Sequence, residues 1–96
     1  MIIEHAELTV SDAEAFEEAF AQARQVIAQA DGFRWVELLH GIERPDVYVL
    51  LVGWDSVEAH MTGFRESPRF ARWRALVGPY FTKPPEVHHL TISSER

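Results

Sequence analysis

The segment at residues 46–54, DVYVLLVGW, is apolar on both faces of the strand that its composition predicts. Successive side chains of a strand point to opposite sides. One side therefore carries Tyr48, Leu50, Val52 and Trp54, and the other carries Val47, Val49 and Leu51. Helices packed on one side of a small sheet leave the second side uncovered. We therefore expect a second copy of the chain to cover it, sheet against sheet.

The segments around this strand follow a regular order. A mixed strand at residues 2–10 precedes a helix, for which Ser11 is the expected N-cap and Gly32 the expected end. One apolar stripe runs along that helix, formed by Phe16, Phe20, Ala23, Ile27 and Ala30. A strand at residues 33–42 and the short connection GIERPD then lead to the 46–54 strand as a hairpin.

The second half of the chain contains a broken helix and a last strand. Asp55 or Ser56 is expected to cap a short helix, on which Val57, His60, Met61 and Phe64 share one face. Ser67 and Pro68 begin a second helix, Gly78 and Pro79 end it, and a strand follows at residues 86–92. The order βαββαβ predicts an α+β, ferredoxin-like fold with an antiparallel sheet.

Length and composition exclude several kinds of protein. Ninety-six residues fit a single domain, 1–96, with a core at about 2–92 and a tail at 93–96. The chain has no cysteine, hence no disulfide and no thiolate metal site, which fits a cytoplasmic protein. The start MIIEHAELTV does not resemble a signal peptide, and the longest apolar run is too short to cross a bilayer. The net charge of −6, without a basic stripe, argues against nucleic-acid binding.

Three stretches of the chain resemble the antibiotic-biosynthesis monooxygenase family. They are GFRWVELLHG, YVLLVGWDSVEAHMTGFRESPRFARWRALVGPYF and PPEVHHL, and together the resemblance covers nearly the whole chain. It implies a dimeric α/β barrel, in which two sheets pack face to face and each subunit keeps a pocket between its sheet and its helices. Some members oxidise polycyclic phenols to quinones with O₂ and no metal or flavin, and others degrade haem.

The resemblance also implies roles for individual residues. In the quinone-forming members a Trp and an Asn lie on the third strand, a polar or aromatic residue on the following helix and an Arg on the last helix. Trp54, His60 and Arg74 match three of these positions, whereas Leu50 stands where the Asn is expected. The residues of the haem-degrading set are replaced here by Ala6, Phe64 and Arg74. Haem binding or degradation is therefore the weaker alternative.

These residues define a hypothesis about function. A cofactor-independent monooxygenase would bind a small aromatic or quinol-like molecule between sheet and helices, with His60 as the base and Arg74 offsetting the phenolate charge. The expected substrate-binding residues are Trp54, Trp73, Phe64, Phe20 and Leu50. For each of these residues, a purely structural role in the core or on the surface is the alternative. A dimer that binds a hydrophobic metabolite without catalysis is the alternative function.

No metal or nucleotide cofactor is expected. His88 and His89 are adjacent on a strand and point to opposite faces, so they do not easily share a metal ion. The sequence contains no HExxH motif and no glycine-rich phosphate loop. The expected partners are a second copy of the chain and a small hydrophobic ligand, with neither nucleic acid nor membrane.

Overall fold

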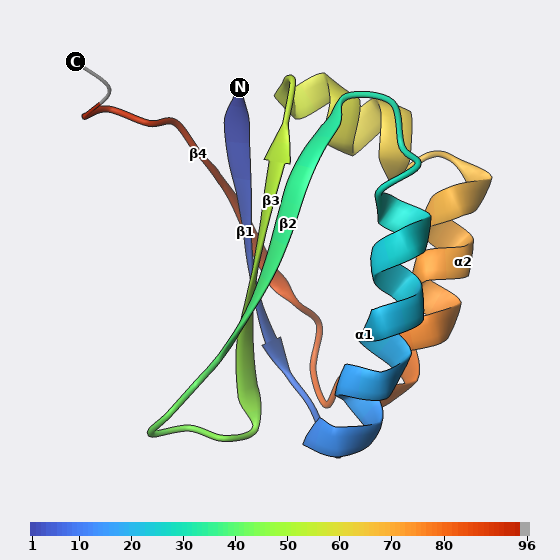
Figure 1. Ribbon diagram of the computed structural model, residues 1–96, viewed down its shortest axis with the longest axis vertical. Helices are drawn as coiled ribbons and strands as arrows, with labels where there is room; N and C mark the ends of the chain where they lie inside the picture. The colour runs from blue at the N-terminus through green and yellow to red at the C-terminus, as the bar shows by residue number, and fades with distance from the viewer. Residues whose placement is uncertain (95–96) are drawn as a thin grey trace.

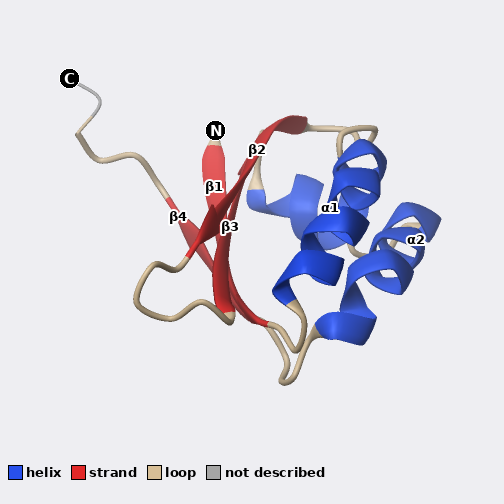
Figure 2. Ribbon diagram, turned by 60° about the horizontal axis from the view of Figure 1, so that its bottom comes forward, coloured by secondary structure: helices blue, strands red, loops and turns tan. Residues whose placement is uncertain are grey.

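The computed structural model describes residues 1–94 and shows a four-stranded antiparallel sheet with two main helices packed on one face (Figures 1 and 2). The sheet order is β2-β3-β1-β4, which confirms the ferredoxin-like βαββαβ fold. The elements are β1 (Ile2–Thr9), α1 (Ala13–Ile27), β2 (Phe33–His40), β3 (Val47–Trp54), a π-helix η1 (Ala59–Phe64), α2 (Pro68–Val77), a 3₁₀ turn η2 (Gly78–Tyr80) and β4 (Glu86–Leu90).

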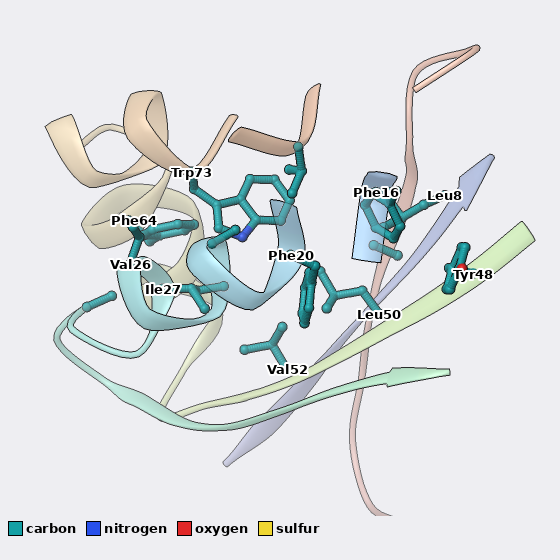
Figure 3. Packing of buried hydrophobic residues seen from close by; sticks show 14 of the residues in the cluster. Leu8, Phe16, Phe20, Val26, Ile27, Tyr48, Leu50, Val52, Phe64 and Trp73 are labelled. Atoms are coloured by element: carbon teal, nitrogen blue, oxygen red, sulfur yellow. The ribbon is translucent and has the colours of Figure 1, made fainter. Parts of the chain in front are cut away.

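Strand β3 lies in the sheet between β2 and β1, as its apolar character predicts. On its helix-facing side Leu50, Val52 and Trp54 are fully buried against the helices. They form one core with the apolar stripe of α1 and with Phe64, Trp73 and Val77 from the second half of the chain (Figure 3). Phe16, Phe20, Ala23 and Ile27 form a buried stripe on α1 as predicted, whereas Ala30 is buried but lies in the turn beyond the end of the helix.

The other face of the sheet carries no helix (Figure 2). On this face, Gly53 of β3 pairs with Ile3 of β1 and with Trp35 of β2, and Val49 of β3 pairs with Leu39 of β2. Leu39 and Leu90, which also point to this face, are each 46% exposed. Charged and polar side chains share this face, because His5 and Glu37 pair with Leu51 and Glu7 pairs with Val49. The face is therefore mixed, with its apolar side chains supplied mainly by β3, and it is open within one copy of the chain.

Several element ends differ from the sequence predictions. The N-cap of α1 is Asp12 and not Ser11, because the Asp12 carboxylate accepts a hydrogen bond from the backbone N–H of Ala15 at 3.1 Å. The same helix ends at Ile27, before Gly32, because the bonds that follow are i→i−3 and tighten the chain into turns. Gly32 adopts φ +83° in the turn that leads into β2. Strands β2 and β4 each end two residues earlier than predicted.

The short helix after β3 is a π-helix, and this changes which of its side chains face inward. Its i→i−5 bonding, as in the Arg65 N–H to His60 C=O bond, gives a wider turn than the predicted α-helical spacing. His60 and Phe64 are buried, but Val57 and Met61 are exposed, so the prediction of one shared face was wrong for those two. Ser56 accepts the hydrogen bond from Ala59 N–H, and Ser67 is the N-cap before Pro68, as predicted.

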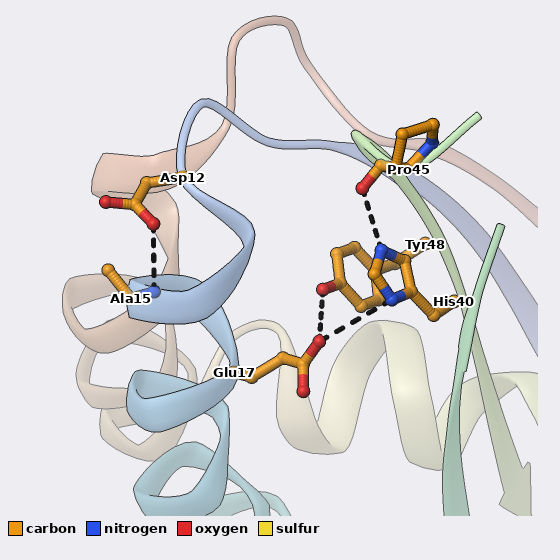
Figure 4. Close-up of polar contacts among 6 residues, drawn as sticks. All are labelled: Asp12, Ala15, Glu17, His40, Pro45 and Tyr48. Carbon is orange, nitrogen blue, oxygen red and sulfur yellow. Dashed lines mark hydrogen bonds and ion pairs between the residues drawn. The ribbon is translucent and has the colours of Figure 1, made fainter. Parts of the chain in front are cut away.

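A polar cluster ties α1 to the β2–β3 hairpin (Figure 4). The Tyr48 hydroxyl donates to Glu17, and the Tyr48 ring stacks on His40 with centroids 4.2 Å apart. His40 Nδ1 lies 3.7 Å from the Glu17 carboxylate and its Nε2 lies 2.7 Å from the Pro45 carbonyl oxygen. Burial and the Glu17 carboxylate both raise the pKa of Tyr48, so this hydroxyl stays protonated and serves as a structural donor.

Candidate functional site

A cavity of about 670 Å³ lies between the helix-facing side of β1 and β4 and the helix α2. Its floor is formed by side chains of β1, and its walls come from η1, α2, the segment that precedes β4, and Val87 of β4. The volume is in the range typical of small-molecule sites. This location, between sheet and helices, is where the resemblance placed a pocket.

Three titratable side chains are joined beside this cavity. Glu4 of β1, buried with 6% of its surface exposed, accepts a hydrogen bond from Trp54 Nε1–H at 3.0 Å. The same oxygen, Oε1, lies 3.3 Å from His60 Nε2. His60 Nδ1 in turn lies 2.9 Å from Nε2 of His89 on β4. The strand register explains the meeting, because Glu4 pairs with His89 across β1 and β4.

Burial sets the charge state of the pair. It raises the pKa of Glu4 to about 6, although the Trp54 hydrogen bond and Arg65 act in the other direction. Burial also lowers the pKa of His60 to about 4, with further lowering by His89 and Arg65. Glu4 is therefore mainly a carboxylate at neutral pH and His60 is neutral. Because a carboxylate only accepts hydrogen bonds, we assign the His60 proton to Nε2, so that Nδ1 accepts from His89.

The geometry of these groups does not form a metal site. They lie in a row, with a contact of 3.3 Å between Glu4 and His60 and a hydrogen bond between His60 and His89, and do not point at a common centre. Among residues 1–94 no set of three His, Asp or Glu side chains is placed to hold a metal ion. The arrangement instead suits proton transfer at the edge of the cavity.

The residues predicted from the sequence fall into two groups. His60, Trp73 and Arg74 line the cavity. Trp54, Phe64, Phe20 and Leu50 are buried in the core and are not among the described residues that line it. Trp54 stacks on His60 with centroids 5.3 Å apart, and Phe64 packs against both Trp54 and Trp73. These two aromatic residues thus support the cavity wall from behind.

Sequence reasoning missed Glu4, His89, Arg65 and Lys83. A signal for Glu4 was present, since strand alternation places it on the same face as Ala6 and Leu8, which are both buried. Arg65 and Lys83 line the cavity together with Arg74, and nothing in their spacing indicated this. Three of the nine Lys and Arg residues in a chain of net charge −6 therefore lie at one cavity.

Comparison with known proteins decides the family. The sequence profile of the antibiotic biosynthesis monooxygenase family matches residues 1–76. The chain belongs to this family. The expected resemblance is thereby confirmed. A solved structure of a family member from Bordetella bronchiseptica is 42% identical, with a TM-score of 0.92 over 95% of both chains.

Two further relatives extend the comparison. The uncharacterized protein YczJ of Bacillus subtilis is 38% identical over 74 residues, which is 77% of this chain and 78% of YczJ. SnoaB, a cofactor-independent oxygenase from Streptomyces nogalater, has a TM-score of 0.82 and covers 95% of this chain and 91% of its own. At 22% identity the likeness to SnoaB concerns the fold. Within the described residues, no helix has the length and apolar character that crossing a membrane requires.

Proposed function

We propose that this member of the antibiotic biosynthesis monooxygenase family is a cofactor-independent oxygenase of a small aromatic, quinol-like molecule. The observation that carries the proposal is the buried Glu4–His60 pair at the wall of a cavity of about 670 Å³. Such a pair accepts a proton in surroundings that exclude much of the water. Family membership supports oxygen as the second substrate.

The chemistry balances without an added reductant. The pair takes a proton from an activated CH₂ group or a phenol, and the electron pair stays on the substrate as a carbanion or phenolate. This electron-rich anion reduces O₂ and combines with it to form a peroxide on carbon. Loss of water then leaves a carbonyl, so that CH₂ and O₂ become C=O and H₂O.

Cationic side chains favour an anionic intermediate in the same place. Arg65, Arg74 and Lys83 all line the cavity, and Lys83 also lies 3.8 Å from Glu86. Positive charge close to a developing phenolate or enolate lowers the energy of that anion. The aromatic rings of Phe70 and Trp73 line the same cavity and offer flat apolar surface to a ring system.

Oxygen uptake tests this function. The protein is incubated with a panel of anthrones and quinols, and O₂ consumption is followed beside His60→Ala and a buffer control. We expect uptake above the buffer rate for some of the panel and a clear decrease in the variant. Equal rates for wild type and variant across the panel would remove His60 from the mechanism. Ligand binding that raises the melting temperature without O₂ uptake would instead support a non-catalytic binding protein, and a Soret band with haemin would support haem binding.

We further propose that the chain forms a homodimer through the uncovered face of its sheet. Apolar side chains of β1, β2, β3 and β4 meet on that face, and Leu39 and Leu90 are each nearly half exposed in one copy. Burial of such a surface is favourable by about 25 cal/mol per Å². Light scattering at low micromolar concentration should give about twice 11.0 kDa, and a stable monomer would contradict the proposal.

A further inference from the structure

The two oxygens of the Glu4 carboxylate have different surroundings. Oε1 accepts a hydrogen bond from Trp54 Nε1–H at 3.0 Å, and His60 Nε2 lies 3.3 Å from the same oxygen. Oε2 makes no hydrogen bond within residues 1–94, and it is not one of the wholly buried unpaired side-chain atoms, so it keeps some accessible surface in the cavity that Glu4 lines. A carboxylate oxygen has two lone pairs to accept hydrogen bonds, so an accessible and unpaired one can contact a molecule in the cavity. Oε2 is therefore the atom of this cluster that remains for a molecule in the cavity.

His60 is placed differently. Its Nδ1 is hydrogen-bonded with His89, and its Nε2 lies against the Glu4 carboxylate at 3.3 Å, so neither ring nitrogen is open to the cavity without a change of contact. Its ring is also held flat against Trp54, with an interplanar angle of 17°. The imidazole would have to break one of these contacts to take a proton from a ligand. Its position suits a residue that orients the Glu4 carboxylate and stabilises its negative charge.

We propose that Glu4, through Oε2, is the base that removes the proton from the bound substrate, and that His60 is a positioning residue. The inference rests on the proposed function and changes which residue performs its first step. In that step a substrate C–H bond breaks, an O–H bond forms at Glu4, and the electron pair remains on the substrate as an enolate. The step needs no oxidant.

The electrostatics of the cluster agree with this role. Because burial raises the pKa of Glu4 to about 6, the group is ionised at neutral pH and yet is a stronger base than an exposed glutamate. The titratable or charged groups that face it are His60 from η1, His89 from β4 and Arg65 from the end of η1. Neutral His60 supplies an N–H donor, and Arg65 favours the carboxylate.

Proton removal without oxygen has a consequence that separates it from oxygenation. In D₂O under nitrogen, an enolate formed in the cavity is reprotonated by deuterium from the solvent. The protein should therefore exchange the CH₂ protons of an anthrone in the absence of O₂. Oxygen uptake is a later step, so the two can be measured independently.

The experiment follows the loss of the anthrone CH₂ signal by proton NMR in anaerobic D₂O. We compare wild type, Glu4→Gln and His60→Gln, after checking that each variant keeps the wild-type circular dichroism spectrum. Wild type should exchange the protons faster than buffer, with a rate that rises with pH around a midpoint near 6. Glu4→Gln should lose about 10²-fold or more, the usual contribution of a general base. His60→Gln keeps an N–H donor near Glu4. Because a positioning residue needs to supply only that donor, the exchange rate of this variant should stay within about tenfold of wild type.

The outcomes divide cleanly. Exchange by Glu4→Gln at the wild-type rate overturns the role of Glu4. Loss of exchange in His60→Gln equal to that in Glu4→Gln overturns the division of roles. A wild-type protein that never exceeds buffer overturns the proposed proton removal as a whole. Anaerobic exchange that depends on Glu4 but is followed by no O₂ uptake in air supports the inference while contradicting the oxygenase function.

Discussion

Replacement of Glu4 by glutamine should raise the free energy of unfolding relative to wild type, and this gain should be larger at neutral pH than in acid. The folded-state pKa of Glu4 is raised from 4.5 to about 6. A raised carboxyl pKa contributes stability that is fully present below about pH 4.5 and is lost as the pH rises through about 6. Glutamine has nearly the same shape and does not titrate, so the variant escapes that loss.

The magnitude follows from the size of the shift. A change of about 1.5 pKa units at about 1.36 kcal/mol per unit corresponds to roughly 2 kcal/mol. The side chain is only 8% exposed, so solvent screening removes little of this. His60 acts in the opposite direction, since its lowered pKa contributes stability that is present above about pH 6.5 and is lost as the pH falls through about 4. Because His60 titrates in both proteins, its effect largely cancels in the difference.

Urea unfolding followed by tryptophan fluorescence measures this difference. Free energies of unfolding are determined at pH 4 and pH 7.5 for wild type and Glu4→Gln, at one protein concentration because dimerisation affects stability. The advantage of the variant should grow by about 2 kcal/mol between the two pH values. Glu18→Gln, at an exposed position of α1, is the matched control. A pH-independent difference for Glu4→Gln, equal to that of the control, would refute the account of a buried ionised carboxylate.

Three other substitutions test the fold and the assembly. Asp12→Ala removes the cap on Ala15 N–H and should lower the free energy of unfolding by about 1 kcal/mol, measured in urea; no change would show that the cap is dispensable. Gly32→Ala places a Cβ at a left-handed φ of +83° and 2.7 Å from the Ala59 Cβ. It should lower the free energy of unfolding by at least about 1–2 kcal/mol and lower the melting temperature, and an unchanged melting temperature would contradict this. Leu51→Lys puts a charge on the uncovered sheet face and should reduce the light-scattering mass to that of a monomer, with the circular dichroism spectrum retained; an intact dimer would place the interface elsewhere.

The parts of the fold that local periodicity determines were predictable. Alternation in β3 predicted a strand with two apolar faces, and the spacing of Phe16, Phe20 and Ala23 predicted the buried side of α1. The cap residue and the end of α1 were not predicted correctly. Adjacent Ser11 and Asp12 are both good caps, so the choice depends on where the first turn closes, which the chain entering from β1 determines.

The candidate site was only partly predictable. His60 and Arg74 were found because they match a family pattern, and the structure places both at the cavity. Glu4 was not singled out, because a carboxylate in a strand is normally exposed. Its burial depends on Trp54 and His60, which lie 50 or more residues away in the sequence. The π-helix was also not predictable, because the spacing of its apolar residues is compatible with an ordinary α-helix. Its wider turn nevertheless directs His60 toward Glu4.

The central claim is that chemistry takes place in the cavity between β1, β4 and α2. Val87 of β4 lines this cavity and is 37% exposed, so Val87→Trp should fill the chamber without disturbing the core. Thr91→Trp, just beyond the end of β4, is the matched control. In an oxygen electrode with an anthrone, wild type and Thr91→Trp should consume O₂ faster than buffer, and Val87→Trp should fall to the buffer rate. Equal consumption by all three proteins would contradict the account.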